Sequence, residues 1–404
     1  MTKTPIYLVL LTVFIDLLGF GIIIPLLPFY AQHFGAGPTV IGLLGSSYSL
    51  MQFLFVPFWG RLSDKIGRRP IILMSVFGSF LSYLIFGLAG SLFTLFLSRV
   101  LAGFMGANIS TAQAYIADVT PVEDRAKYMG LIGASFGIGF MLGPFVGGIM
   151  SHISYGAPGY LASGLSLINV TLAYFYLPES RTKTASLASE NLDPARRARI
   201  LDIDAIRIAF KKPALPNLIL VYFLYTISFS TLYVSFPLYT KEILKYDAAA
   251  NGYLFALMGL IGVFIQGGLI GKIINVLGER NTMVIGIILL ILGLSFIPDT
   301  RSPAVLVVLI IVMSTGSSIL TPSLTSLITK YAGATEYGSA LGVSQSFSSL
   351  GRVIGPSLGG AILGTAGLIW PFYSSSILLV AAVVLARKIP NLYNAKATEF
   401  ATSK

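Results

Sequence analysis

Two related loop sequences divide this chain into repeats. Positions 60–69 read GRLSDKIGRR and positions 271–280 read GKIINVLGER, so two glycines, a basic residue, an aliphatic residue, an Asp or Asn and a final arginine recur in register. A second matching pair, GPFVGG at 143–148 and GPSLGG at 355–360, has the same offset to within one residue. Two independent matches at one spacing are hard to obtain by chance, and they indicate two parallel halves.

Apolar runs lie on both sides of these loops. The chain of 404 residues is 55% hydrophobic and only 11% charged, whereas soluble domains carry roughly 25% charged residues. A helix needs about 20 apolar residues to cross a hydrocarbon core about 30 Å thick. Twelve runs are long enough or nearly so: 6–31, 40–59, 70–89, 91–117, 127–150, 158–177, 216–240, 250–270, 281–297, 303–328, 339–363 and 367–387.

The repeats and the runs together predict the fold class. We expect an all-α integral membrane protein whose twelve transmembrane helices form two parallel, pseudo-symmetric six-helix halves, residues 1–177 and 213–404. The segment 178–212 between them is rich in Lys and Arg and contains no spanning run. We therefore expect a cytoplasmic linker that lets the halves rock, with a short surface helix from Asp202 to Lys212.

Basic residues are distributed unevenly about the runs. Of the 27 Lys and Arg, 22 fall in the N-terminus, the loops after even-numbered runs and the C-terminus. Lys241, Lys245 and Arg301 fall on the other side, and Arg99 and Arg352 lie inside runs. This positive-inside pattern predicts a cell-membrane protein with both termini in the cytoplasm. The net charge of +11 therefore reflects topology, and nucleic acid is not an expected partner.

Several kinds of chemistry find no support in the sequence. The chain has no cysteine, and its two histidines, His33 and His152, are far apart, so we expect no metal site. No nucleophile–base set is visible, and the phosphate-binding pattern Gly-x-x-x-x-Gly-Lys-Ser/Thr is absent. The sequence therefore predicts neither an enzyme nor a cofactor, and it leaves an ion gradient as the energy source for any transport.

One acidic residue, Asp16, lies deep in the first run. It is about 15 Å along a helix from the start of the run, near the centre of the membrane core. A charge there costs at least about 2.5–3.5 kcal/mol, so such a group is expected to face the interior of a helix bundle and to have a functional role. We hypothesise that Asp16 binds the proton in proton-driven transport.

These features resemble the major facilitator superfamily of transporters, and within it the drug:proton antiporter branch that includes the tetracycline efflux pumps. The resemblance covers nearly the whole chain. The loop at 60–69 is similar to the loop signature of the superfamily, and the pattern at 139–148 is similar to the motif that marks antiporters. Asp16 followed by glycines and prolines, and Arg99 followed by small residues, are similar to further motifs of this branch.

The resemblance implies roles for the first two motifs. The loop is expected to act as a latch between the halves on the cytoplasmic face, against the start of the run 339–363. Small residues four positions apart make a ridge for close helix packing, and proline bends the helix. The latch residues are Gly60, Asp64, Gly67, Arg68, Arg69 and Asp118, and the antiporter motif comprises Gly139, Gly143, Pro144, Gly147 and Gly148.

The resemblance also places Asp16 and Arg99 on helices that line a central cavity. We hypothesise that the two side chains are coupled electrostatically, directly or through water. A nearby arginine favours the ionised acid, whereas burial favours the neutral acid. The alternative interpretation is a static ion pair that joins the first and fourth helices.

The remaining cavity residues are expected from helical spacing. The run 216–240 carries an aromatic stripe and the run 303–328 a hydroxyl stripe, which suit an amphipathic compound but also suit packing. Arg352 has no membrane acid to pair with in the second half. Three alternatives remain for its partner: backbone carbonyls freed by Pro356, water, or an anionic substrate. The expected residues are Ser110, Gln113, Tyr222, Tyr225, Phe229, Tyr233, Ser314, Ser318, Thr321 and Arg352.

We therefore predict a secondary active transporter that exports a small amphipathic organic compound in exchange for protons. The protein is expected to be a monomer in the lipid bilayer, with the proton gradient in place of a cofactor. One alternative is a symporter or uniporter of a metabolite such as a sugar, an organic acid or a lipid. Another is a membrane receptor without transport, which would tolerate loss of Asp16 and Arg99.

Overall fold

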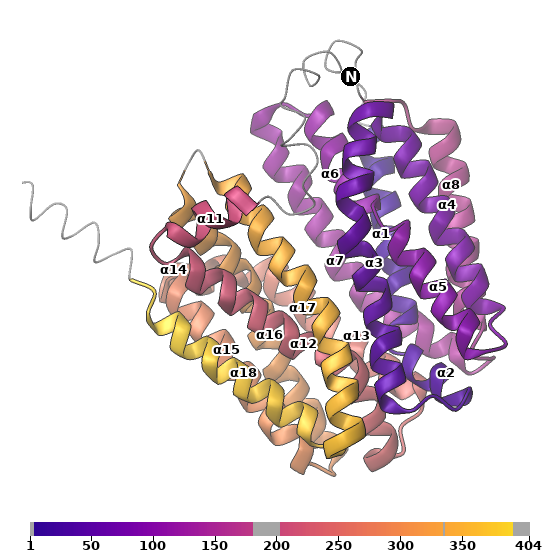
Figure 1. Cartoon of the computed structure of the whole chain (residues 1–404), viewed down its shortest axis with the longest axis vertical. Helices are drawn as coiled ribbons and strands as arrows, with labels where there is room; N and C mark the ends of the chain where they lie inside the picture. The colour runs from indigo at the N-terminus through magenta and orange to yellow at the C-terminus, as the bar shows by residue number, and fades with distance from the viewer. Residues whose placement is uncertain (1–3, 181–202, 334–335, 391–404) are drawn as a thin grey trace, which may run out of the picture.

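The computed structural model describes residues 4–180, 203–333 and 336–390, and in these residues the regular secondary structure is entirely helical. Figure 1 shows the first group of helices on one side and the second group on the other. The first group comprises α1 (Thr4–Ile23), α2 (Leu27–His33), α3 (Pro38–Ile66), α4 (Arg68–Gly87), α5 (Leu92–Phe104), α6 (Asn108–Val119), α7 (Val122–Ser151) and α8 (Ala157–Tyr176).

The second group begins with a short helix, α11 (Ile203–Lys211), in the part of the linker where the sequence predicts one. The π-helical turn η1 (Ile265–Leu269) and the 3-10 turn η2 (Ile297–Asp299) interrupt or end two of its longer helices. The α-helices of the second group that follow α11 are α12 (Leu215–Leu244), α13 (Ala248–Phe264), α14 (Ile270–Leu277), α15 (Glu279–Phe296), α16 (Pro303–Ala332), α17 (Tyr337–Ala366) and α18 (Trp370–Arg387).

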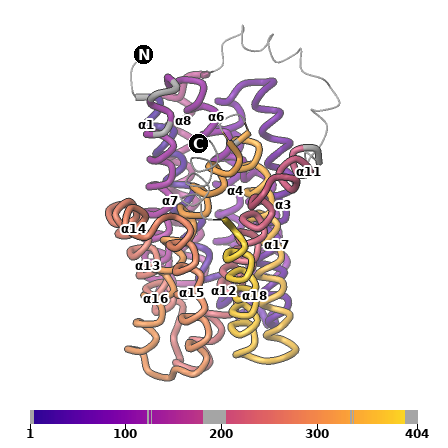
Figure 2. The backbone as a smooth tube through the Cα atoms, turned by 90° about the vertical axis from the view of Figure 1, so that its left-hand side faces the viewer, coloured from indigo at the N-terminus to yellow at the C-terminus, as the bar shows by residue number. Residues whose placement is uncertain are grey.

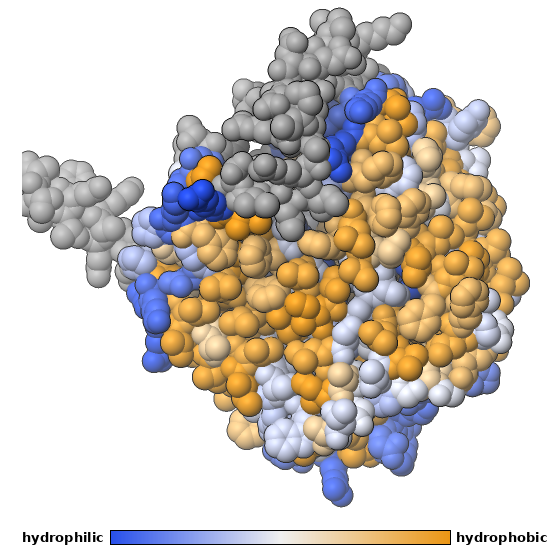
Figure 3. Space-filling view, viewed as in Figure 1, coloured by the Kyte–Doolittle hydropathy of each residue, from blue (hydrophilic) through white to orange (hydrophobic). Residues whose placement is uncertain are grey.

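Ten helical segments in the described residues are long and apolar enough to cross a membrane. The helices α8, of 20 residues, and α17, of 30 residues, occupy the two other predicted runs. Figure 2 shows the long helices running roughly parallel to one another. In Figure 3 hydrophobic residues form a broad belt, and hydrophilic residues gather toward the ends of the molecule. The predicted all-α membrane fold is confirmed. Among the described residues, ten of the twelve predicted spans have the length and hydropathy of a membrane-crossing helix.

Two of the predicted runs are not continuous helices. The first run divides into α1 and α2 around Pro25, where the missing N–H of proline removes a helical hydrogen bond. The fourth run divides into α5 and α6, with a break at 105–107. Side chains from other helices bind the freed backbone there: Trp59 Nε1 donates to Phe104 O at 2.6 Å, and Ala107 N donates to Ser75 Oγ at 3.2 Å. Non-helical backbone at membrane depth requires such partners.

Each group of helices has its own apolar core. In the second group, Ile287 and Leu290 of α15 and Ile310 and Met313 of α16 are all fully buried in one cluster. In the first group, a cluster that includes Val9 joins α1 to α4, α6 and α7. Because these cores are largely separate, the two groups can move relative to each other while each keeps its own packing.

Glycines bring the two halves together at one end of the bundle. A Cβ added at Gly42 of α3 would lie 2.5 Å from Pro356 O and 3.0 Å from Gly360 Cα of α17. A Cβ added at Gly148 of α7 would lie 3.0 Å from Ala249 O of α13. This end, which holds α2 and the starts of α3 and α13, is called the closed end below. The opposite end, which holds the turn between α3 and α4, is called the basic end.

Substitution of Gly42 is expected to open the closed end. In Gly42→Ala the new methyl group meets backbone atoms that cannot rotate away, at a cost of about 1–3 kcal/mol. That cost should increase the population with a separated closed end about fivefold or more. The measurement is the distance between spin labels at His33→Cys and Glu242→Cys, which is simple because the chain has no cysteine.

The matched control is Gly133→Ala, because a Cβ at Gly133 of α7 meets no atom within 4 Å. It should leave the distance distribution unchanged. Equal distributions for Gly42→Ala and the parent protein would show that this contact does not hold the closed end together.

Candidate functional site

A cavity of about 940 Å³ lies between the two halves. Residues from α1, α3, α5, α6 and α7 line it on one side, and residues from α12, α16 and α17 line it on the other. The lining extends past the middle of α3 to Pro57, and on the other side to Ile328 and Gly342 near the basic end. The cavity is therefore bounded by the packed glycines at the closed end and extends toward the basic end.

Seven of the residues predicted for the cavity or for proton coupling line it. They are Asp16, Arg99, Ser110, Gln113, Tyr222, Tyr233 and Arg352.

Five other predicted cavity residues do not line it. They are Tyr225, Phe229, Ser314, Ser318 and Thr321. The Tyr225 hydroxyl lies 2.7 Å from Ser317 Oγ, and its ring packs against Phe229 with centroids 5.7 Å apart. Ser314 and Ser318 are 4% and 5% exposed. In this conformation these side chains form part of the packing inside the second half, and their contact with a cargo stays a prediction.

Asp16 is the only acid among the described residues that line the cavity. Its Oδ1 accepts a hydrogen bond of 2.8 Å from Ser79 Oγ of α4. Asn108 of α6 approaches the same carboxyl group. The amide of Asn108 is 1% exposed, and both of its polar atoms lack a hydrogen-bond partner among the described residues. Asp16 therefore lies in a polar site with spare hydrogen-bonding capacity.

Arg99 of α5 is 3% exposed and lies against aromatic rings. Its guanidinium carbon is 5.3 Å from the ring centre of Phe86 and 5.9 Å from that of Tyr83. Nε donates to Ser98 Oγ at 3.3 Å, and Nη2 has no hydrogen-bond partner among the described residues. Cation–π contacts partly compensate such a buried charge.

Asp16 and Arg99 form no ion pair with each other in the described part of the chain. Tyr83 lies between them: its hydroxyl is 3.5 Å from the backbone oxygen of Asp16, and its ring lies beside Arg99. The static ion pair considered from the sequence is thus not formed in this conformation. Coupling between the two residues through Tyr83 or through water stays a prediction.

Arg352 of α17 extends into the cavity from the second half. Its Nη1 donates to Ser348 Oγ at 3.2 Å, and its Nη2 donates to Ser349 Oγ at 3.0 Å. Among the described residues it has no carboxylate partner. Tyr48 of α3 lies close enough to interact electrostatically with Arg352, Asp16 and Arg99. The three charged groups therefore share one neighbourhood.

Sequence reasoning missed the polar side chains that α3 and α17 contribute to the cavity. Gln52 Nε2 donates to Tyr48 Oη at 3.1 Å and to Gly106 O, in the break between α5 and α6, at 3.2 Å. Gln345 and Ser349 line the cavity from α17. The available signal was the presence of glutamines in the apolar runs 40–59 and 339–363.

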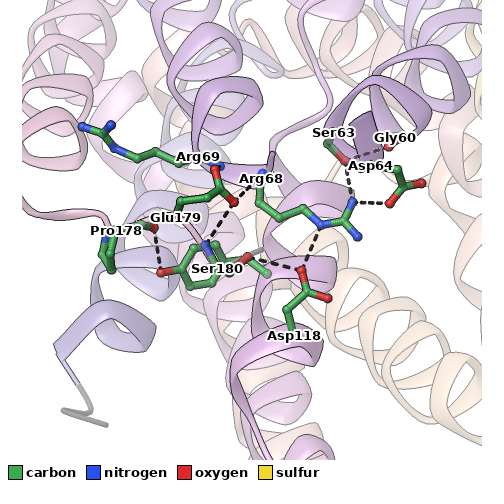
Figure 4. A network of polar contacts seen from close by, with 10 residues as sticks. Gly60, Ser63, Asp64, Arg68, Arg69, Asp118, Pro178, Glu179 and Ser180 are labelled. Atoms are coloured by element: carbon green, nitrogen blue, oxygen red, sulfur yellow. Dashed lines mark hydrogen bonds and ion pairs between the residues drawn. The ribbon is translucent and has the colours of Figure 1, made fainter. Parts of the chain in front are cut away.

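The loop motif forms a compact network within the first half (Figure 4). Arg68 Nη1 lies 2.7 Å from Asp64 Oδ1, and its Nε lies 3.0 Å from Asp118 Oδ2. Gly67 has φ +108°, which strains any residue with a side chain. Arg69 Nη2 donates to Tyr174 O at 2.6 Å.

The latch predicted against α17 is not formed in this conformation. Among the described residues, the partners of Arg68 belong to the first half and to the start of the linker, and a Cβ at Gly60 would meet no atom within 4 Å. The basic end is open here, which separates the loop from the second half. The role of the loop as a latch between the halves therefore stays a prediction for the opposite conformation.

Glu179 is a further residue that the sequence did not reveal. Its carboxylate accepts the backbone N–H groups of Arg68 at 2.9 Å and Arg69 at 3.1 Å (Figure 4). These are the first residues of α4, whose N–H groups have no partner inside the helix. The neighbouring Ser180 donates to Asp118 at 3.2 Å. The start of the linker is thus fastened to the loop motif.

The second half contains the same turn with its charges exchanged. Gly278 repeats the left-handed glycine, with φ +74°. Glu279 stands at the position of Arg68 and forms an ion pair with Lys330, which stands at the position of Asp118. The repeat therefore preserves an ion pair between equivalent helices but reverses its polarity.

Comparisons with known proteins agree with this architecture. The model of the Major Facilitator Superfamily matches residues 9–297 and 267–401. The chain is 32% identical over 355 residues to the tetracycline resistance protein, class E, of Escherichia coli, covering 87% of this chain and 86% of that one. It is 28% identical over 392 residues to multidrug resistance protein 2 of Bacillus subtilis (strain 168), covering 95% and 94%. The solved human organic anion transporter MFSD10 (TETRAN) matches with a TM-score of 0.72 and 26% identity, over 95% of this chain and 99% of that one.

Removal of the Glu179 carboxylate is expected to destabilise the first half. In Glu179→Ala two N–H groups of α4 lose their acceptor, which costs about 1–2 kcal/mol for a helix cap. The measurement is the thermal unfolding temperature in detergent. Glu242→Ala, which removes an exposed acid at the closed end, is the control and should leave that temperature unchanged. Equal stability of the two variants would contradict a capping role for Glu179.

Proposed function

The chain belongs to the Major Facilitator Superfamily, and on this premise we propose that it exports a small, partly apolar organic compound in exchange for protons. It is a transporter and not an enzyme. The observation that carries the proposal is a single carboxylate, Asp16, on the wall of a cavity to which both halves contribute. A charged acid at this depth is costly and is characteristic of proton relays in transporters.

The arrangement of the halves supports alternating access. Backbone contacts at Gly42 and Gly148 close one end, while the cavity extends to the other. The positive-inside distribution of Lys and Arg assigns the basic end to the cytoplasm. The conformation is then the one that receives a compound from the cytoplasm, and both termini lie on that side.

Proton exchange requires that proton and cargo compete. Ionised Asp16 attracts a basic cargo and retains the hydrogen bond from Ser79. A proton that arrives from the opposite side neutralises the acid and removes this attraction. Arg99 is held by the rings of Phe86 and Tyr83, and its charge favours release of the proton again. In the outward-facing state the loop motif is proposed to dock against the start of α17.

The names of the relatives indicate a class of cargo. One relative is named for tetracycline resistance and another for multidrug resistance. The cavity volume of about 940 Å³ and its aromatic lining, with Tyr222, Tyr233 and Phe140, suit an antibiotic of this size and amphipathic character. The proton gradient supplies the energy, no cofactor is needed, and a monomer in the lipid bilayer contains the complete cavity.

Asp16→Asn is expected to abolish transport driven by a pH gradient. Asparagine retains the size of the side chain but cannot exchange a proton at neutral pH. The measurement is accumulation of rhodamine 123, a fluorescent cation, by inverted vesicles or proteoliposomes with an imposed gradient. Driven transport should fall to the level of empty vesicles, while passive exchange of the dye should continue.

Asp124→Asn, which alters an exposed acid of α7, is the control and should transport like the parent protein. Unchanged driven transport by Asp16→Asn would remove Asp16 from the mechanism. If the dye and protons move in the same direction across the membrane, the protein is a symporter and the antiport proposal is wrong.

A further inference from the structure

We propose that the exported compound is a zwitterion, whose acidic group binds Arg352 while its basic group competes with the proton at Asp16. This inference rests on the proposed function and adds the charge pattern of the cargo. It follows from how the charges of the cavity are divided between the two halves.

Arg352 is a charged group without a charged partner. Its guanidinium has five N–H donors, and the described residues offer it two serine hydroxyls, Ser348 and Ser349. A cation inside a spanning helix is costly if nothing neutralises it. The guanidinium fork matches two oxygens of an acidic group such as a carboxylate in a bidentate geometry. An acidic group on the cargo would supply the missing partner.

The position of Arg352 is fixed before any ligand arrives. Ser348, which accepts from Nη1, is 1% exposed, and its hydroxyl lies 3.2 Å from Thr226 Oγ1 of α12. Ser349, which accepts from Nη2, lines the cavity. The guanidinium is thus held on the cavity wall by two successive residues of its own helix. A preorganised cation of this kind binds an acid with little further loss of entropy.

The other two charges of the cavity are arranged differently. Arg99 is 3% exposed and is enclosed by aromatic rings, so it is the less accessible of the two arginines. Asp16 lines the cavity from α1 of the first half, whereas Arg352 lines it from α17 of the second half. The accessible charges are therefore one acid and one base on opposite walls, and their complement is a compound with one base and one acid.

Aromatic side chains line the same cavity as these two charges. They include Tyr48 of α3, Phe20 of α1 and Tyr233 of α12. Such rings suit a flat aromatic body that separates the two charged ends of the cargo. A purely cationic compound would leave Arg352 unpaired, and a purely anionic one would be repelled by ionised Asp16.

The test uses three xanthene dyes with a common body and different charges. Rhodamine 110 has a cationic ring system and a free carboxylate, rhodamine 123 is its methyl ester and has only the cation, and fluorescein has the carboxylate without the cation. Binding to the detergent-solubilised full chain is measured by fluorescence anisotropy at pH 7.5. The parent protein is expected to bind rhodamine 110 about tenfold more tightly than either of the other dyes.

Two variants assign the preference to its residues. Arg352→Gln should reduce the affinity for rhodamine 110 to that for rhodamine 123, which itself should change less than twofold. Arg352→Lys, which keeps the charge but not the fork, should retain part of the preference. Asp16→Asn should abolish the preference for rhodamine 110 over fluorescein. The control is Arg301→Gln, which alters an exposed arginine outside the cavity and should bind all three dyes like the parent protein.

Failure of this inference and failure of the proposed function give different results. If the parent protein shows no preference for rhodamine 110, or if Arg352→Gln keeps the preference, the zwitterion proposal is overturned, even where a pH gradient drives rhodamine 123 transport. If the preference depends on Arg352 and Asp16 but no gradient drives transport, the charge pattern is supported and proton exchange is overturned. Unfolding temperatures of the variants identify any loss of binding that comes from misfolding.

Discussion

Close contact between glycine backbones is the constraint on which the architecture depends. Lipid is as apolar as a leucine side chain, so helices in a membrane associate through packing and not through the hydrophobic effect. In α7, a Cβ at Gly139 would lie 2.9 Å from Leu17 Cβ of α1, and a Cβ at Gly143 would lie 2.7 Å from Gly21 Cα of the same helix. The motif therefore first joins helices within one half.

The same motif then joins the halves. Gly148, at its end, faces Ala249 and Gly252 of α13. The repeat does likewise, because Gly355 and Gly359 of α17 pack on α12 while Gly360 faces Gly42 of α3. One short pattern thus makes a close contact inside each half and another between the halves. Such an arrangement allows the seam at the closed end to separate without loss of the packing inside either half.

The sequence predicted those features that repeat or that follow a period. The matching loops at 60–69 and 271–280 indicated two halves, and the apolar runs located the helices to within a few residues. Asp16 and Arg352 were recognised because a charge in an apolar run is conspicuous at any position. The network of Arg68 with Asp64 and Asp118 was expected from the motif, and the structure brings these three side chains together.

Features that depend on distant partners were not predictable. The break at 105–107 is stable because Trp59 and Ser75, on other helices, bind its backbone. In the sequence Glu179 is an acid just after an apolar run, and nothing there distinguishes it from other acids of the linker. Only the fold brings it to the start of α4. Helical spacing predicts which residues share one face of a helix, but not what that face contacts. Tyr222 and Tyr233 line the cavity, whereas Tyr225, which lies between them in the sequence, packs on Ser317.

The division of charge between the halves has a consequence for coupling. Asp16 belongs to the first half and Arg352 to the second, so a rocking motion about the closed end changes the distance between them. A cargo that binds both groups holds the halves at one separation, and a proton on Asp16 removes one of the two attachments. A proton on Asp16 then changes the affinity of each conformation for the cargo. The conformational equilibrium shifts by the difference between these affinities, as thermodynamic linkage requires. In the proposed mechanism the energy of the gradient reaches the cargo through these two side chains, while Arg99 acts on proton release and the loop motif acts on the outward-facing state.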